Sequence, residues 1–259
     1  MGILNLTNDS FFDGGRFNSE KKALDQVLKM VKNEVDIVDI GGYSSRPNAP
    51  YVSLKDEWER LENILKAITN EFPQLILSMD TFRAEIAKRA IDCGADMIND
   101  ISSGQLDNKM FSTVASLQVP YIMMHMQGTP QTMQLNPTYD NVTKDISTFF
   151  EEKINLAHQA GIKQVIIDPG FGFGKKLNHN YQLLNNLDSL LALNKPLLVG
   201  VSRKSMIYKV LETSADEALN GTTYIHSICL SKGASIIRAH DVKEAQQCIK
   251  LFNFAKTNC

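Results

Sequence analysis

Cysteine, tryptophan and long apolar runs are all scarce in this 259-residue sequence. The four cysteines lie far apart with no Cys-x-x-Cys pair (Cys93, Cys229, Cys248, Cys259), so neither a disulfide framework nor a cysteine metal site is indicated. Free thiols are typical of a reducing compartment, and we expect a cytoplasmic protein. No apolar run approaches the roughly 20 residues of a membrane helix, so no membrane partner is expected. The start MGILNLTND is polar from residue five, unlike a signal peptide.

An excess of basic residues is also missing. The formal net charge is −2, from 27 basic and 29 acidic side chains. There is thus no general positive field to hold nucleic acid, and no nucleic-acid partner is expected. Any site for an anionic ligand must be built from a few local cations.

Eight apolar runs each end in a short polar or glycine-containing stretch. A strand that is buried on both faces has such a continuous apolar sequence. Eight strands and 259 residues suit one (β/α)8 barrel, in which the C-terminal strand ends share one pocket. The eight segments are 2–9, 35–42, 75–81, 96–102, 120–126, 164–170, 196–204 and 235–241.

The segments between these runs have the apolar spacing of helices. One begins after Ser53, a plausible N-cap followed by the acidic Asp56 and Glu57. Strand and helix alternate throughout, which predicts parallel crossovers and an α/β fold: a TIM barrel forming one domain over residues 1–259. A doubly wound open sheet is the alternative. The expected helices are 18–33, 54–68, 84–93, 109–118, 146–157, 182–193, 217–232 and 243–254.

Polar side chains gather at the predicted strand ends. Carboxylates and an amide suit the N–H and amino edge of a flat nitrogen heterocycle, and the cations after the last two strands suit a phosphate. We interpret Asp39 and Asp100 as structural, Arg203 as an outward ion-pairing residue and His125 as a core imidazole. The whole set is Asn5, Asp39, Asp80, Asn99, Asp100, His125, Asp168, Ser202, Arg203, Lys204, Arg238 and His240.

Several common catalytic motifs are absent from the sequence. The glycines of DPGFGFGK (168–175) do not match the G-x-x-x-x-G-K-[ST] phosphate loop. There is no H-E-x-x-H and no G-x-S-x-G either.

Taken in order, one per strand, the motifs resemble bacterial dihydropteroate synthase over residues 1 to about 254. They are MGILNLTNDSFFDGG, DIGGYSSRPNAP, SMDT, NDI, MMHMQGTPQTM, DPGFGFGKKLNHN, LLVGVSRKSMI and IIRAHDVKE. The resemblance implies a transferase of folate biosynthesis, the target of sulfonamides. It would condense (7,8-dihydropterin-6-yl)methyl diphosphate with 4-aminobenzoate to give 7,8-dihydropteroate and pyrophosphate. It also implies a homodimer that uses Mg²⁺.

Carried over by position, the resemblance assigns a role to each site residue. Asp80, Lys204, Arg238 and His240 would be catalytic. The pterin would contact Asp80, Asn99, Asp168 and Lys204, with Ile101, Met124 and Gly200 lining the pocket. Arg238, His240 and Asn5 would hold the diphosphate, with Asn5 as the Mg²⁺ ligand. The aminobenzoate would contact Ser45, Arg46, Pro47, Phe173, Ser202 and Lys204.

The chemistry expected of such a site is an SN1-like substitution, with Asp80 stabilising a developing pterin-methylene cation. We further expect the loops 7–15 and 41–50 to close after the diphosphate binds, giving ordered kinetics. Within the second loop Tyr43 and Ser45 stand where Glu and Thr are usual. Two alternatives remain: a methyltransferase barrel that binds methyltetrahydrofolate, and a pterin-binding paralogue without catalytic activity.

Overall fold

The computed structural model describes residues 1–6, 16–44 and 51–258. These residues form eight parallel strands, of which the first six make one sheet in sequence order and the last two pair with each other. Single bridges from Ile167 to Leu197 and from Gly2 to Ala239 join the two sheets at both edges. The sheet is therefore closed, and the open doubly wound sheet is wrong. The strands are β1 (Gly2–Asn5), β2 (Ile37–Gly41), β3 (Ile76–Asp80), β4 (Met97–Asp100), β5 (Tyr121–Met124), β6 (Val165–Asp168), β7 (Leu198–Val199) and β8 (Ile236–Ile237).

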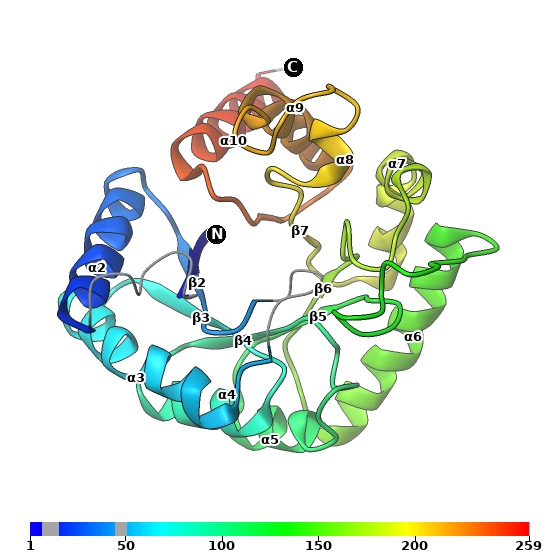
Figure 1. Ribbon diagram of the computed structural model, residues 1–259. Helices are drawn as coiled ribbons and strands as arrows, with labels where there is room; N and C mark the ends of the chain where they lie inside the picture. Colours follow the sequence, from blue (N-terminus) through cyan, green and yellow to red (C-terminus); the bar gives the residue numbers. More distant parts are fainter. Residues whose placement is uncertain (7–15, 45–50, 259) are drawn as a thin grey trace.

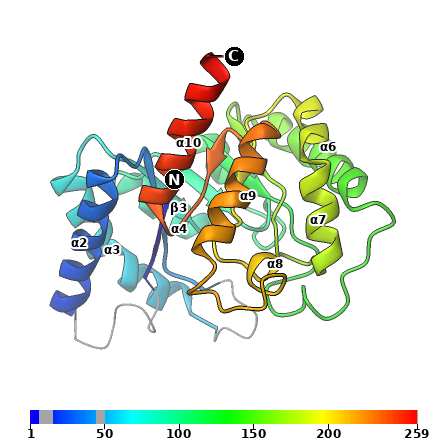
Figure 2. The same ribbon diagram turned by 90° about the horizontal axis from the view of Figure 1, so that it is seen from above.

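Helices surround these strands as a ring (Figure 1), and from a second direction α2, α7 and α9 are seen to stand along the outside (Figure 2). The predicted cap is confirmed, since Ser53 accepts a hydrogen bond from the Asp56 N–H. The helices are α2 (Arg16–Lys32), α3 (Leu54–Glu71), α4 (Ala84–Asp92), α5 (Met110–Leu117), α6 (Val142–Ala160), α7 (Leu177–Asn185), α8 (Ser205–Tyr208), α9 (Leu219–Ser231) and α10 (Val242–Thr257), with a 3-10 helix η1 (Leu187–Leu193).

The single helix expected over 182–193 is wrong. The chain leaves helical geometry at Asn186 (φ −112°, ψ 20°), where α7 ends and the 3-10 turn η1 begins. The Asn186 side-chain amide donates to the Gln182 carbonyl at 2.8 Å and so satisfies one of the terminal acceptors of α7. The short helix α8 lies outside the eight expected helix ranges.

Alternate residues of each strand face opposite sides of the barrel wall. Residues such as Val38, Ile40 and Met79 join the helices in the large outer core. Residues of the other parity form a separate cluster inside the wall, which includes Met97, Ile122 and Leu198. Because side chains alternate along a strand, the polar residues that continue this inner series reach the C-terminal mouth. In the described part of the chain, no helix is both long and apolar enough to cross a membrane.

Candidate active site

The strand register brings the predicted polar residues into one arc at the mouth of the barrel. Asn5 pairs with Gly41, Gly41 with Asp80, and Asp80 with Asn99. Two strands further on, Met124 pairs with Asp168. Neighbouring strands lie about 4.8 Å apart, so these side chains share one end of the barrel interior.

Arg238 connects the last strand to two carboxylates across the mouth. Its Nε donates to Asp39 Oδ2 at 2.7 Å, and its Nη2 donates to Asp80 Oδ2 at 2.9 Å. Burial raises the pKa of Asp80 to about 7, with the charge of Asp39 adding to the shift and Arg238 opposing it. Burial alone would lower the pKa of Arg238, but Asp39 and Asp80 outweigh it and raise that pKa. The guanidinium is thus firmly charged, while the Asp80 carboxyl is balanced between its two forms near neutral pH.

Asp39 is the centre of this network, although the sequence suggested only a structural role. Its carboxylate is fully buried, and Oδ2 accepts from both Arg238 and the Asn99 side-chain amide, the latter at 2.9 Å. The inner-facing parity of β2, which runs Ile37, Asp39, Gly41, is the sequence signal that could have placed it there. Asp39 therefore links a residue of the expected pterin pocket, Asn99, to one of the expected diphosphate site, Arg238.

Asp168 and Lys204 face each other on the opposite side of the mouth. Burial raises the pKa of Asp168, and the nearby Lys204 opposes that shift. Burial lowers the pKa of Lys204 to about 8, with Asp168 opposing and Arg238 reinforcing the change. The Lys204 ammonium donates to the Phe171 carbonyl at 2.5 Å and lies 4.7 Å from the centroid of the Phe173 ring. This side therefore offers a carboxylate, a cation and an aromatic face within reach of one ligand.

Gly200 leaves space between the two cations of the mouth. A Cβ at this position would lie 3.9 Å from Arg238 Cβ and 4.0 Å from Lys204 Nζ. Beside this space Ile101 and Met124 belong to a small apolar cluster with Met126 and Met133, against which Phe82 and Phe173 also pack. An apolar wall next to buried carboxylates suits a flat heterocycle with a polar edge.

His240 lies beside Ser202 at the ends of the last two strands. The Ser202 hydroxyl accepts from the His240 N–H at 3.2 Å and lies 3.1 Å from His240 Nδ1. Burial and then the charge of Arg238 lower the pKa of His240 to about 4. Before a ligand binds, His240 is thus a neutral hydrogen-bonding group and not the cation that its position suggested.

Lys175 is a buried residue of the β6–α7 connection that sequence reasoning missed. Its Nζ lies 2.9 Å from the Gly170 carbonyl, 3.0 Å from the Phe173 carbonyl and 2.9 Å from His125 Nδ1. Three acceptors thus surround the amine, whose pKa is lowered well below its ordinary value by burial, with Asp168 opposing the shift. Gly170 is required here, because its φ is +68° and a Cβ would approach the His125 carbonyl oxygen to 2.0 Å. The Lys175 side chain thus fixes the conformation of the loop that follows Asp168 and contains Phe173.

Three of the residues interpreted as structural have the expected surroundings. His125 is buried against Lys175, and burial with that neighbour lowers its pKa well below the usual value. Asp100 faces the outer core, where it accepts from the Tyr121 hydroxyl at 2.6 Å. Arg203 points away from the mouth and pairs with Asp241 at 2.8 Å.

Part of the expected aminobenzoate site lies outside the described residues, namely Ser45, Arg46 and Pro47 together with the loop 7–15. The neighbouring Tyr43 is described. Its ring meets Phe82 edge to face at 5.1 Å between centroids and lies 5.4 Å from the Arg83 guanidinium carbon. The departure from Glu at this position is therefore accommodated by an aromatic contact.

A closed barrel with carboxylates, an amide and cations around one apolar-walled mouth has the fold and site of a TIM-barrel enzyme for a flat ligand with a polar edge. The family model described as pterin-binding enzyme matches residues 1–240. Dihydropteroate synthase of Haemophilus influenzae is 44% identical over 254 residues, which cover 97% of this chain and 92% of the relative.

Two solved structures share the fold closely. The Yersinia pestis dihydropteroate synthase in complex with a sulfonamide drug has a TM-score of 0.93 and 39% identity, covering 100% of this chain and 94% of the other. The Xanthomonas albilineans enzyme with 4-aminobenzoic acid has a TM-score of 0.93 and 34% identity, covering 100% and 93%. The chain belongs to the pterin-binding enzyme family and, within it, to the dihydropteroate synthases, transferases of folate biosynthesis.

Proposed function

We propose that this chain joins (7,8-dihydropterin-6-yl)methyl diphosphate to 4-aminobenzoate and releases pyrophosphate. The observation that supports it most directly is the division of the mouth into two halves. Asp168, Lys204 and Asn99 offer hydrogen-bonding groups to a pterin, whereas Arg238 and His240 lie where a diphosphate would extend from it. Asp80 lies between them, paired with Arg238 at 2.9 Å.

The bond that breaks joins the pterin methylene carbon to the diphosphate oxygen. We propose that it breaks largely before the new C–N bond forms, because an aromatic amine is a weak nucleophile. Asp80 would then face the cation on the methylene group. At about 4 Å and an effective dielectric near 20, such a pair is worth about 4 kcal/mol. If that interaction exists only in the transition state, it accelerates the reaction several hundred-fold.

Negative charge grows on the pyrophosphate as it departs, and the site must stabilise that charge. Arg238 is charged and reaches into the mouth, where it pairs with Asp80, so it can donate to the leaving oxygens when that pairing is exchanged for substrate. His240 can donate a hydrogen bond, and the arriving anion would raise its pKa. Ser202 orients this imidazole through its hydroxyl.

The family resemblance also implies Mg²⁺, and the donor set at the mouth fits a weakly held ion. Within the described residues no group of three or more His, Cys, Asp or Glu could hold a metal. Asn5 would supply one hard oxygen ligand at the end of β1, and substrate phosphates and water would supply the others. When bound, the ion would partly neutralise the diphosphate.

The aminobenzoate would lie between the Phe173 ring and the β7 end. Phe173 is half-buried beside the Lys204 ammonium, and Ser202 is nearby at the mouth. An aromatic face and a cation together suit the ring and the carboxylate of this substrate.

Pyrophosphate release, measured with and without 4-aminobenzoate, tests the proposal for the wild type and for Asp80→Asn. We expect turnover by the wild type and a loss of at least a hundred-fold in the variant. An inactive wild type would remove the assignment and favour the non-catalytic paralogue. Methyl transfer from methyltetrahydrofolate in the absence of diphosphate turnover would instead favour the methyltransferase barrel.

A further inference from the structure

Strands β7 and β8 have the shortest ladder among the described strand pairs. It contains two paired positions, Leu198 with Ile236 and Val199 with Ile237. One further backbone bond, from the Arg238 N–H to the Val199 carbonyl at 2.9 Å, extends it. Ser202, Lys204 and His240 all lie beyond that point, so the ladder does not determine how the two strand ends face each other.

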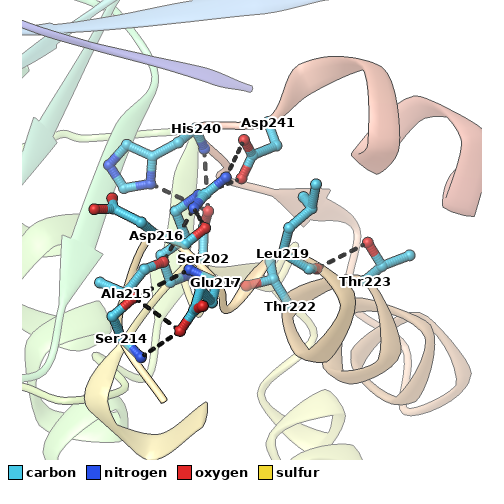
Figure 3. Close-up of polar contacts among 11 residues, drawn as sticks. Ser202, Ser214, Ala215, Asp216, Glu217, Leu219, Thr222, Thr223, His240 and Asp241 are labelled. Atoms are coloured by element: carbon cyan, nitrogen blue, oxygen red, sulfur yellow. Dashed lines mark hydrogen bonds and ion pairs between the residues drawn. The ribbon is translucent and has the colours of Figure 1, made fainter. Parts of the chain in front are cut away.

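Arg203 and Asp241 connect these ends where the ladder stops. The guanidinium meets the carboxylate in a fork, with Nε to Oδ2 at 2.8 Å and Nη2 to Oδ1 at 3.0 Å. Its Nη1 donates to the carbonyls of Ala215 and Asp216 at 3.0 and 2.5 Å. Figure 3 shows Asp241 and His240 side by side near Ser202, with Ala215 and Asp216 close to them. A two-point pair of this kind fixes both distance and orientation.

The backbone conformation at Arg203 connects the ion pair to the residues of the mouth. Its φ is +54°, a left-handed conformation that is uncommon for a residue with a side chain. The Arg203 N–H donates to the Thr222 hydroxyl at 3.0 Å, which supports that turn. Because of the turn, Arg203 points outward while its neighbours Ser202 and Lys204 contribute to the mouth.

We propose that Arg203 and Asp241 are a positioning pair for the reaction: they hold Ser202 and Lys204 at one strand end in register with His240 at the other. The inference rests on the proposed function, because it concerns the residues assigned to the diphosphate and the pterin. Arg203 and Asp241 themselves touch no substrate. Both are partly exposed, at 24% and 21% of their side-chain surface, so breaking their pairing costs less stability than breaking a buried pair. A displacement of about 1 Å at the reacting groups, in contrast, can cost a hundred-fold in rate.

The test compares Arg203→Lys and Asp241→Asn with Arg89→Lys, which alters an exposed pair with Glu85 on α4. Lysine keeps the charge but cannot reproduce the two-point fork. We expect both variants of the pair to lower kcat/KM for the pterin diphosphate by tenfold or more and to weaken binding of inorganic pyrophosphate by a similar factor. Their Tm should stay within a few degrees of the wild type, and Arg89→Lys should change none of these three quantities. The double variant should be about as impaired as either single one, since both break one interaction.

Unchanged kcat/KM and pyrophosphate affinity in Arg203→Lys would overturn the inference. A loss of activity that only follows a fall in Tm would overturn it as well, since it would mean general destabilisation. If the wild type proves inactive, the proposed function fails separately, and the pyrophosphate affinities still decide whether the pair orders this end of the barrel.

Discussion

Arg238 and Asp39 form an ion pair of 2.7 Å in which the aspartate is fully buried. The second carboxylate oxygen, Oδ1, has no hydrogen-bond partner within the described part of the structure. A buried charge is tolerated when it is paired, and removing one partner is strongly destabilising. Arg238 therefore has two carboxylate partners with different tasks. Asp39 keeps it in place, and Asp80 lies where it can exchange that pairing for an interaction with substrate.

The pKa of Asp80 should respond in opposite directions to changes in these two neighbours. Asp39→Asn removes a negative charge that raises this pKa, so the pKa should fall. Arg238→Gln removes a positive charge that lowers it, so the pKa should rise above its wild-type value of about 7. Titration of ¹³C-labelled aspartate carboxyls by NMR measures both shifts. Movement in the same direction in both variants would contradict the network described here.

Asp80→Asn should make the protein more stable at high pH while it removes activity. The folded-state pKa of about 7 lies above the ordinary 3.8, so between these values the folded state binds a proton that the unfolded state does not. The free energy of unfolding therefore falls as pH rises through this window, by up to about 4 kcal/mol for about three pKa units. Asparagine avoids that loss. Urea unfolding at pH 5 and pH 8 measures the free energy of unfolding of both proteins, and the difference should shift in favour of the variant as pH increases. A variant that is less stable than the wild type at pH 8 would rule this out.

The eight strands were predictable because a barrel wall is apolar on both faces, and that property is local to each segment. The rim residues followed where a strand ends in a polar residue of inner parity, as β3 does at Asp80 and β6 does at Asp168. What could not be predicted depends on contacts between distant segments. Lys175 meets His125 across 50 residues, and the neutrality of His240 results from burial by the folded barrel. The partners of Asp39 could not be predicted either, because an aspartate near a strand end has the same sequence context whether it caps, braces or binds.

Pyrophosphate binding should be accompanied by proton uptake at His240. The free imidazole has its pKa lowered to about 4 by burial and Arg238, so it is neutral at pH 6. An adjacent diphosphate would raise this pKa, and the ring would then take up a proton from solution. Calorimetry at pH 6 in two buffers of different ionisation enthalpy measures that uptake. His240→Gln is the control, because pyrophosphate itself titrates, and equal proton uptake by the two proteins would exclude His240 as the source.

Lys175→Met should destabilise the protein and disturb the site, although Lys175 is absent from the expected set of site residues. Methionine fills a similar volume but leaves the Phe173 carbonyl and the Nδ1 of His125 without the Lys175 donor, whereas the Gly170 carbonyl keeps the Phe173 N–H. Unsatisfied buried acceptors of this kind cost about 1–3 kcal/mol each, so we expect a loss of about 2 kcal/mol or more in the free energy of unfolding.

The loop shaped by Lys175 directly follows Asp168, the last residue of β6, so KM for the pterin diphosphate should rise by tenfold or more in the fraction that remains folded. Lys176→Met is the matched control, because Lys176 is the next residue and its side chain is exposed. It should leave the urea midpoint and KM unchanged. If Lys175→Met were as stable as this control, the three short contacts of the Lys175 amine would not be what holds the loop.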